Sequence, residues 1–182
     1  MQTITTTLTT EATYYDDGTK RYLLRKIWDK SKPTLAIIML VPSAAAGIEL
    51  DSTTLLVLNN AARLGFGGVD TLNLFATIND FGLKAAEDDD PDNLNAILQS
   101  AEKAGTLVYT AGTGKAKNKA FQQRQEQVLN ALRPYESKLH CLTNESGKAR
   151  LQHPLSPAVR TWYNYYCTEC IAAVGHKPNQ RL

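Results

Sequence analysis

The sequence lacks the features that would assign it at once to a secreted, membrane or disulfide-rich class. Only three cysteines occur among 182 residues, and this odd, small number argues against a disulfide framework. No apolar run approaches the roughly 20 residues that a membrane span needs. The N-terminus lacks the basic and then apolar regions of a secretory signal. We therefore expect a cytoplasmic protein that does not enter the membrane.

Strong charge and internal repetition are absent as well. The formal net charge is +2, so bulk charge neither requires nor excludes a polyanionic partner. No repeat recurs at the periods of solenoid proteins. The content of 43% hydrophobic and 21% charged residues is typical of a globular chain. We expect a single domain over residues 1–182, with residues 1–11 forming either a tail or an edge strand.

The pattern of apolar segments and breakers predicts an α/β fold. Residues 12–15 and 21–28 flank Asp-Asp-Gly and predict an N-terminal β-hairpin. Four short apolar segments predict strands: 35–41, 69–75, 106–110 and 138–141. Four longer segments predict helices: 52–63, 91–103, 117–132 and 158–173. This alternation predicts a three-layer α/β/α sandwich with a mainly parallel central sheet.

Ligands of such sheets bind beyond the carboxyl ends of the strands, which directs attention to the segment after the first core strand. Pro42 and Ser43 are followed by three alanines and a glycine, so a ligand could approach the backbone amides closely. A plain strand-to-helix connection explains the same residues. Asp51 and the hydroxyl residues after it form either a helix cap, which is the simpler interpretation, or part of a catalytic site.

The next two strands carry further candidates for ligand binding. Asn73 lies within an apolar strand, where its amide is costly to bury without partners. It could read the edge of a base or tie down a neighbouring loop. Phe75 could stack on a planar ligand, although a role in the core is favoured. Gly112 stands at the exit of the third strand, in a Gly-Thr-Gly-Lys segment that lacks the spacing of a nucleotide-triphosphate loop.

A basic stretch follows this exit and suits the phosphates of a nucleic acid. It consists of Lys115, Lys117, Lys119 and Arg124. An ordinary solvated face is the favoured alternative.

Two prolines restrict the segment from His153 to Pro157 and would hold His153 and Ser156 in fixed directions. A rigidly held imidazole can donate a hydrogen bond to an oxygen that gains negative charge during a reaction. A surface turn of the same composition is an equally good interpretation.

The C-terminal region invites a zinc interpretation that we do not favour. Cys167 and Cys170 have the spacing of half a tetrahedral site, with Cys141 before them and His176 after. No second close pair exists, and the segment is expected to be helical, so packed thiols are favoured over a metal. We expect neither a metal nor a cofactor. The aromatic residues 162–166 are expected to lie on this helix against the sheet.

Several motifs, in order between positions 21 and 155, resemble an uncharacterised family known as domain of unknown function 1643. They are Arg21-Tyr22-Leu23-Leu24-Arg25 with Trp28, Ile38-Met39-Leu40 with Pro42-Ser43, Asp51 with Thr54, Gly65-Phe66-Gly67-Gly68, Asn73-Leu74-Phe75-Ala76, Asn93, Gly112, Cys141-Leu142-Thr143 and His153-Pro154-Leu155. This order is similar to that of the uracil-DNA glycosylase superfamily.

The second resemblance implies roles for individual residues. Val41 takes the place of the residue that positions water, Asn73 that of the base-reading residue, and His153 with Ser156 that of the late loop. It implies that a base enters a pocket and that His153 stabilises the departing base anion. Val41 cannot orient a water, which leaves Asp51 as the candidate for that task.

Three functions remain open from the sequence. The first is recognition of a nucleic-acid base followed by N-glycosidic base removal, as in a DNA glycosylase-like hydrolase. The second is a catalytically silent module that binds a nucleotide or nucleic acid, which is suggested by the inability of Val41 to orient a water. The third is an interaction protein that uses its aromatic C-terminal helix. Recognition of a nucleobase or nucleic acid is the favoured interpretation.

Overall fold

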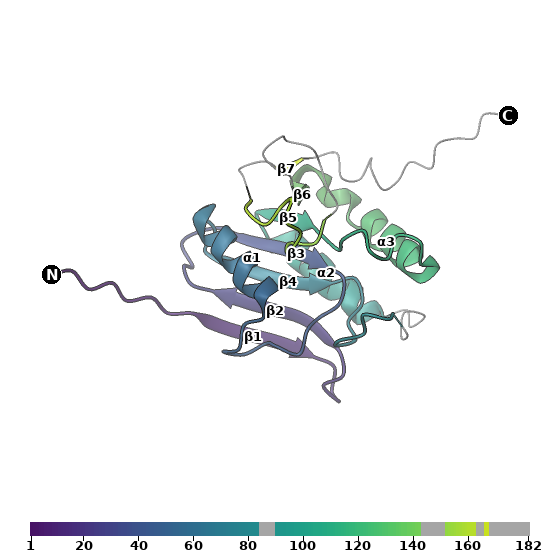
Figure 1. Cartoon of the computed structure of the whole chain (residues 1–182), viewed down its shortest axis with the longest axis horizontal. Coiled ribbons are helices and arrows are strands. Elements are labelled where there is room, and N and C mark those ends of the chain that lie inside the picture. Colours follow the sequence, from purple (N-terminus) through teal and green to yellow (C-terminus); the bar gives the residue numbers. More distant parts are fainter. Residues whose placement is uncertain (84–89, 143–151, 163–165, 168–182) are drawn as a thin grey trace.

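The computed structural model describes residues 1–83, 90–142, 152–162 and 166–167 (Figure 1). The described strands are β1 (Thr9–Tyr14), β2 (Arg21–Ile27), β3 (Thr34–Met39), β4 (Gly68–Asn73), β5 (Thr106–Tyr109), β6 (Leu139–Leu142) and β7 (Tyr166–Cys167). The described helices are α1 (Ser52–Arg63), α2 (Pro91–Lys103), α3 (Lys119–Ala131) and the short 3₁₀ helix η1 (Arg133–Lys138).

These strands form one sheet in the order β1-β2-β4-β3-β5-β6-β7. The pairs β3–β4, β3–β5 and β5–β6 are parallel, whereas β1–β2, β2–β4 and β6–β7 are antiparallel. The sheet is therefore mixed, and the prediction of a mainly parallel sheet is wrong. The predicted parallel core exists, but the N-terminal hairpin joins it along β4 and turns that half of the sheet antiparallel.

The predicted hairpin is confirmed as β1 and β2. Gly18 adopts a φ of +74° in the turn and its N–H donates to the carbonyl of Tyr15, as an Asp-Gly turn requires. Every residue of β1 is exposed, so only its pairing with β2 attaches it to the sheet. Residues 1–8 are exposed and extend away from the sheet (Figure 1).

Three helices begin at polar residues that cap them. Asp51 accepts a hydrogen bond from the N–H of Thr54 at the start of α1, and Asp90 does the same for Asn93 at the start of α2. Asn118 caps α3. Each cap satisfies one of the backbone donors that a helix start leaves unpaired. The sequence placed these three helices correctly to within two residues.

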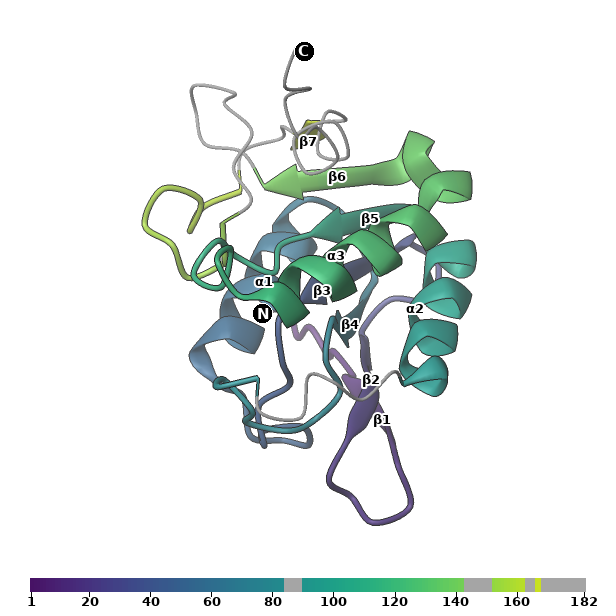
Figure 2. The same cartoon turned by 90° about the vertical axis from the view of Figure 1, so that its right-hand side faces the viewer.

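Helices cover both faces of the sheet. An apolar cluster on one face joins alternate sheet residues such as Ile38 and Leu72 to α2 and α3. A second cluster on the other face joins Leu35 and Val69 to α1. Figure 2 shows α1 on the opposite side of the sheet from α2. The predicted three layers are therefore present around the mixed sheet.

The C-terminal region differs from the prediction. Residues 158–162 form turns rather than the start of a helix, and Tyr166–Cys167 form strand β7 beside β6. The turn residues Val159 and Trp162 instead pack against the α1 face of the sheet. Cys141 is disulfide-bonded.

None of the helices in the described part of the chain is long and apolar enough to cross a membrane.

Candidate functional site

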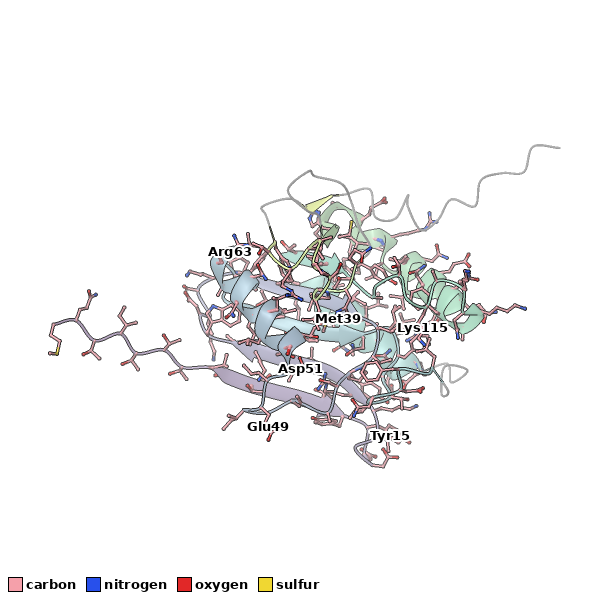
Figure 3. All side chains as sticks on the ribbon, viewed as in Figure 1. Tyr15, Met39, Glu49, Asp51, Arg63 and Lys115 are labelled. Carbon is pink, nitrogen blue, oxygen red and sulfur yellow. The ribbon has the colours of Figure 1, made fainter. Side chains whose placement is uncertain are left out.

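The chain changes direction across the sheet between β3 and β5. β3 is followed by α1 on one face of the sheet and leads to β4, whereas the adjacent β5 is followed by α3 on the other face and leads to β6. Ligands of open α/β sheets bind at such a switch point, beyond the carboxyl ends of the strands. Figure 3 shows Asp51 and Lys115 toward this edge and Arg63 at the opposite end of α1.

Asn73 is the last residue of β4 and is paired in register with Met39 of β3. Its neighbours Leu72 and Leu74 point into the α2–α3 cluster, so strand alternation places the Asn73 side chain on the α1 face. Asn73 is 1% exposed, and neither its Oδ1 nor its Nδ2 has a partner among the described residues. Buried amides are nearly always hydrogen-bonded, so this side chain calls for an explanation.

Two cationic side chains of β2 hold the loop after β3, residues 43–47, by hydrogen bonds to its carbonyls. Arg21 Nη1 donates to the carbonyls of Ser43 and Ala45, each at 2.9 Å. Lys26 Nζ donates to the carbonyl of Gly47 at 2.7 Å and to that of Ala46 at 3.4 Å. The carbonyls of this small-residue loop therefore face the protein interior.

Asp51 links this loop to α1. Its Oδ1 accepts the N–H of Thr54 at 2.7 Å, and its Oδ2 accepts a short hydrogen bond from the Ser43 hydroxyl. Burial alone would raise the pKa of the Asp51 carboxyl, but the bonds from Ser43 and Thr54 outweigh it and lower that pKa. Asp51 is thus an ionised helix cap with a partner on each oxygen, and the simpler interpretation of this residue is confirmed.

The loop that carries His153 is fixed to the end of β5. The hydroxyl of Thr110 donates a short hydrogen bond to the carbonyl of Gln152. Gly112 adopts a φ of +82°, and a Cβ at this position would lie 3.5 Å from the Cβ of His153. The N–H of Ser156 donates to the carbonyl of His153 at 2.8 Å and closes a turn. The structure therefore brings His153, Gly112 and Ser156 together.

His153 is held in one orientation and one tautomer. Its Nδ1 accepts the N–H of Leu155 at 3.3 Å, so in the neutral ring the proton resides on Nε2. Burial lowers the pKa of His153, although the negative charge of Asp51 partly opposes this shift. A neutral imidazole with a free Nε2–H can donate a hydrogen bond to a group that becomes negative.

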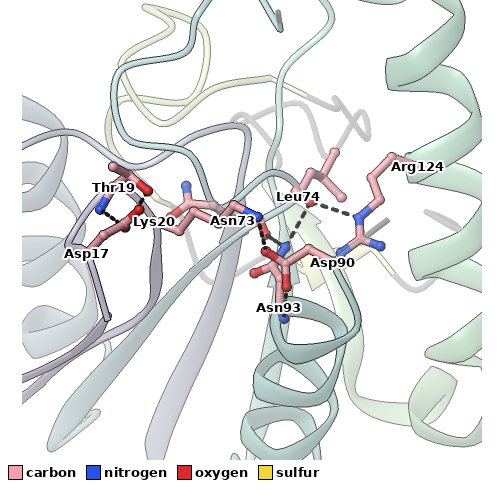
Figure 4. A network of polar contacts seen from close by, with 8 residues as sticks. All are labelled: Asp17, Thr19, Lys20, Asn73, Leu74, Asp90, Asn93 and Arg124. Atoms are coloured by element: carbon pink, nitrogen blue, oxygen red, sulfur yellow. Dashed lines mark hydrogen bonds and ion pairs between the residues drawn. The ribbon is translucent and has the colours of Figure 1, made fainter. Parts of the chain in front are cut away.

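A polar network occupies the other face of the same sheet edge (Figure 4). Asn93 Nδ2 donates to the carbonyls of Asn73 and Leu74 at 3.1 and 3.0 Å, and Arg124 Nε donates to Leu74 at 2.9 Å. Asp90 forms an ion pair with Lys20 at 3.1 Å. These contacts fix the backbone that carries Asn73, while the Asn73 side chain projects to the opposite face.

Several predicted site residues lie apart from this group. Val41 and Phe75 are buried in the apolar cluster of the α2–α3 face, together with Leu83. The core role favoured for Phe75 is thus the one observed. Val41, which the resemblance places beside a catalytic water, faces hydrophobic side chains. Its neighbour Pro42 is buried and accepts the N–H of Asn79 at 2.8 Å.

The basic stretch divides into two parts. Lys117 and Lys119 are exposed and Lys115 is half-buried, so these three lysines form a solvated group. Arg124 is buried, points to the end of β4, and also donates to Gln127 at 2.6 Å. Arg124 therefore does not share the surface on which a phosphate backbone would meet the lysines.

Sequence reasoning missed the roles of Arg21, Lys26, Thr110 and Asn93. Arg21 and Lys26 interrupt an apolar strand, and this mixed pattern is a signal that cations face the interior. Their partners are loop carbonyls about 20 residues later in the chain, which no periodicity reveals. Asn93 belongs to the quoted family pattern but carried no assigned role.

Some of the residues considered as zinc ligands lie outside the described part of the chain. Cys170 and His176 lie outside the described residues, as does most of the predicted aromatic helix. Within the described ranges, no three His, Cys, Asp or Glu residues are grouped so as to hold a metal ion.

A family described as a protein of unknown function, DUF1643, matches residues 21–155. This match covers most of the chain, and the protein belongs to that family. No curated protein and no solved structure matches the chain. The similarity to uracil-DNA glycosylases in motif order therefore remains a prediction from the sequence.

Proposed function

We propose that this member of the DUF1643 family recognises a nucleobase, in a nucleotide or a nucleic acid, and removes it by N-glycosidic cleavage. The observation that carries the proposal is the buried, unpartnered amide of Asn73 at the carboxyl end of β4. A primary amide offers one acceptor and two donor hydrogens, which complement the hydrogen-bonding edge of a base. A ligand that fills this role would repay the cost of burying the amide.

His153 supports the chemical step. In the proposed reaction the bond between the sugar C1′ and the base nitrogen breaks, and its electron pair leaves with the base. The Nε2–H of His153 donates a hydrogen bond to the departing base anion. Water supplies the hydroxyl that bonds to C1′ and the proton that finally neutralises the base. One hydrogen-bond donor to developing negative charge is worth about 10²–10³-fold in rate.

The surroundings of Val41 and Asp51, the two residues considered for positioning water, favour a second function, which is binding without catalysis. Val41 lies in the apolar cluster, and both oxygens of Asp51 already accept hydrogen bonds. Neither residue is free to activate water in this arrangement. A silent protein would bind the same nucleobase through Asn73 without turnover.

Two measurements test the proposal. The first is thermal stabilisation by nucleobases, nucleosides and short oligonucleotides, comparing the native protein with Asn73→Leu and with the control Asn59→Leu. Asn59 is exposed on α1 and remote from the strand end. We expect stabilisation of the native protein and of the control but not of Asn73→Leu. No stabilisation by any of these compounds would refute base recognition.

The second measurement is base release from duplexes and single strands that carry varied modified bases, detected as alkali-labile abasic sites. We expect His153→Ala to lower the rate about 10²-fold while ligand-dependent stabilisation persists. Binding without release by the native protein would establish the silent alternative. Release that is unaffected by His153→Ala would remove His153 from the mechanism.

A further inference from the structure

Arg21 and Lys26 are two buried cations on the same strand. Arg21 is 3% exposed and Lys26 is 2% exposed. Charged side chains are seldom buried so completely unless an opposite charge accompanies them, because desolvation costs several kcal/mol per ion. The question is what balances their charge.

The hydrogen-bond partners found for these two cations are neutral. Four are loop carbonyls, and the others are the hydroxyl of Thr10, 3.0 Å from Lys26 Nζ, and the phenol of Tyr14 beside Arg21. Neither cation forms an ion pair with any described carboxylate. Asp51 is the carboxylate whose charge acts on Arg21, while the positive charge of Arg21 acts on Lys26. Two positive charges thus face a single negative one.

The loop above these cations presents unused donors. Its carbonyls turn inward to Arg21 and Lys26, and no backbone N–H from residue 43 to residue 47 donates to any other part of the described chain. Arg21 Nε is a further buried donor without an acceptor. Successive backbone N–H groups backed by positive charge form a favourable environment for an anion.

We propose that the loop Ser43–Gly47 is an anion subsite that binds the phosphate group of the ligand. The identity of the ligand as a nucleotide rests on the proposed function. The position of the anion subsite does not. The loop follows β3, and Asn73 ends the adjacent β4, so a base at Asn73 and a phosphate at the loop belong to one small ligand. The ligand is therefore a nucleotide, free or within a strand, rather than a free base.

The first test compares ligands on the native protein. Each common nucleoside and its 5′-monophosphate are titrated under identical conditions by calorimetry. We expect the monophosphate of the preferred base to bind at least about tenfold more tightly than the nucleoside, since charge-assisted hydrogen bonds are the strong ones. Equal affinities would overturn the subsite.

The second test adds a negative charge to the loop without disturbing its clamp. Ala44 is exposed, and Ala44→Glu should repel an anion bound to the neighbouring N–H groups. Ala62→Glu places the same charge at the other end of α1 and serves as the matched control. With inorganic phosphate as the probe, we expect a rise in Tm for the native protein and Ala62→Glu but not for Ala44→Glu.

A third pair of variants tests the buried charge itself. Lys26→Met keeps an unbranched apolar side chain and removes its charge, while Lys32→Met removes an exposed lysine that pairs with Asp29. We expect Lys26→Met to lose most of the preference for monophosphate over nucleoside and Lys32→Met to keep it. If Lys26→Met does not fold, the Ala44→Glu comparison decides.

The two proposals can fail separately. Phosphate stabilisation that Ala44→Glu abolishes, with no base bound through Asn73, would leave the subsite standing and refute base recognition. Binding of nucleosides through Asn73, with no gain from phosphate, would leave base recognition standing and refute the subsite. Phosphate binding that Ala44→Glu leaves unchanged would place the anion elsewhere and also refute it.

Discussion

The two faces of the sheet treat their polar groups differently at the same edge. On the α2–α3 face, Asn93 and Arg124 donate to the carbonyls that end β4, around a cavity of about 10 Å³. That volume suits on the order of one water molecule. On the α1 face, Asn73 and the Nε of Arg21 are buried without partners. Asn93 Oδ1 on the α2–α3 face also lacks a partner among the described residues, so the two faces differ in degree: Asn93 uses its Nδ2, whereas Asn73 uses neither of its amide atoms.

Asn73 and Asn93 are close neighbours that differ in the hydrogen bonding of their buried amides. Both are asparagines with 1% or less of their surface exposed, and Asn93 donates to the backbone carbonyl of Asn73 itself. Asn93 donates twice to the backbone, whereas the unpaired amide of Asn73 costs stability, a cost that a base would offset in the proposed function. Unsatisfied polar groups in otherwise well-packed proteins are expected at functional sites for this reason.

The largest effect should come from Asn93→Leu. This change removes two hydrogen bonds to buried carbonyls, of which that of Leu74 keeps its bond from Arg124, and it costs about 1.5–3 kcal/mol. Urea unfolding of the variant and the native protein measures the difference in the free energy of unfolding. A change below about 0.5 kcal/mol, the size of ordinary surface effects, would show that this face is no better satisfied than the other.

Arg124→Met should come next, with a loss of about 1–2 kcal/mol from the bond to the carbonyl of Leu74. Lys117→Met is the matched control, because Lys117 is exposed in the same predicted basic stretch and should change stability by less than about 0.5 kcal/mol. Equal effects in the two variants, again by urea unfolding, would mean that Arg124 belongs with the solvated lysines after all.

Asn73→Leu should have the opposite sign. The side chains are similar in size, and replacing an unpaired buried amide by an apolar group should raise the free energy of unfolding by about 1 kcal/mol. The same variant should lose stabilisation by nucleosides. If Asn73→Leu is destabilised and still binds nucleosides, the buried Asn73 amide has a structural role and does not bind a base.

The smallest effect concerns pH. Burial lowers the folded-state pKa of both His153 and His140 below the ordinary value of 6.5. As the pH falls through 6.5, the unfolded chain takes up protons before the folded one, so stability declines from about pH 7 downward until the folded pKa values are passed. His153→Asn should flatten part of this decline in a series of Tm measurements between pH 8 and pH 5. An unchanged pH profile would show that His153 is more solvated than its burial indicates.

Local patterns predicted most of the elements. Pro91 at the first position of α2, with Asp90 before it, marked that helix exactly, and the apolar run ending at Pro42 marked β3. The hairpin was evident because Asp-Gly fixes a turn within a few residues. Residues 158–162 do not begin the predicted C-terminal helix, because packing and two hydrogen bonds with Asn60, about 100 residues away, hold them in turns and bends. Asn60 Nδ2 donates to the carbonyl of Arg160, and the N–H of Trp162 donates to Asn60 Oδ1.

The candidate site was predictable only in part. The carboxyl ends of β3 and β5 follow from the α/β alternation and indicate Ser43 and Gly112. Asn73 is indicated by its place in an apolar strand, and His153 by the prolines that follow it. The direction of each side chain did not follow from these patterns. Val41 and Phe75 turn into the α2–α3 cluster, and Arg124 turns to the end of β4.

The sequence by itself determined where most strands and helices form and which edge of the sheet carries polar residues. These are local matters, decided by turn chemistry and by periodicity over a few residues. Only the tertiary structure decided that β2 adds antiparallel to β4 and that Arg21 and Lys26 are buried beneath the Ser43–Gly47 loop. Only it showed that the Asn73 amide is buried without a partner. Strand pairing and side-chain burial depend on contacts between segments that are distant in the sequence. These contacts form only when the whole domain packs, so local patterns do not reveal them.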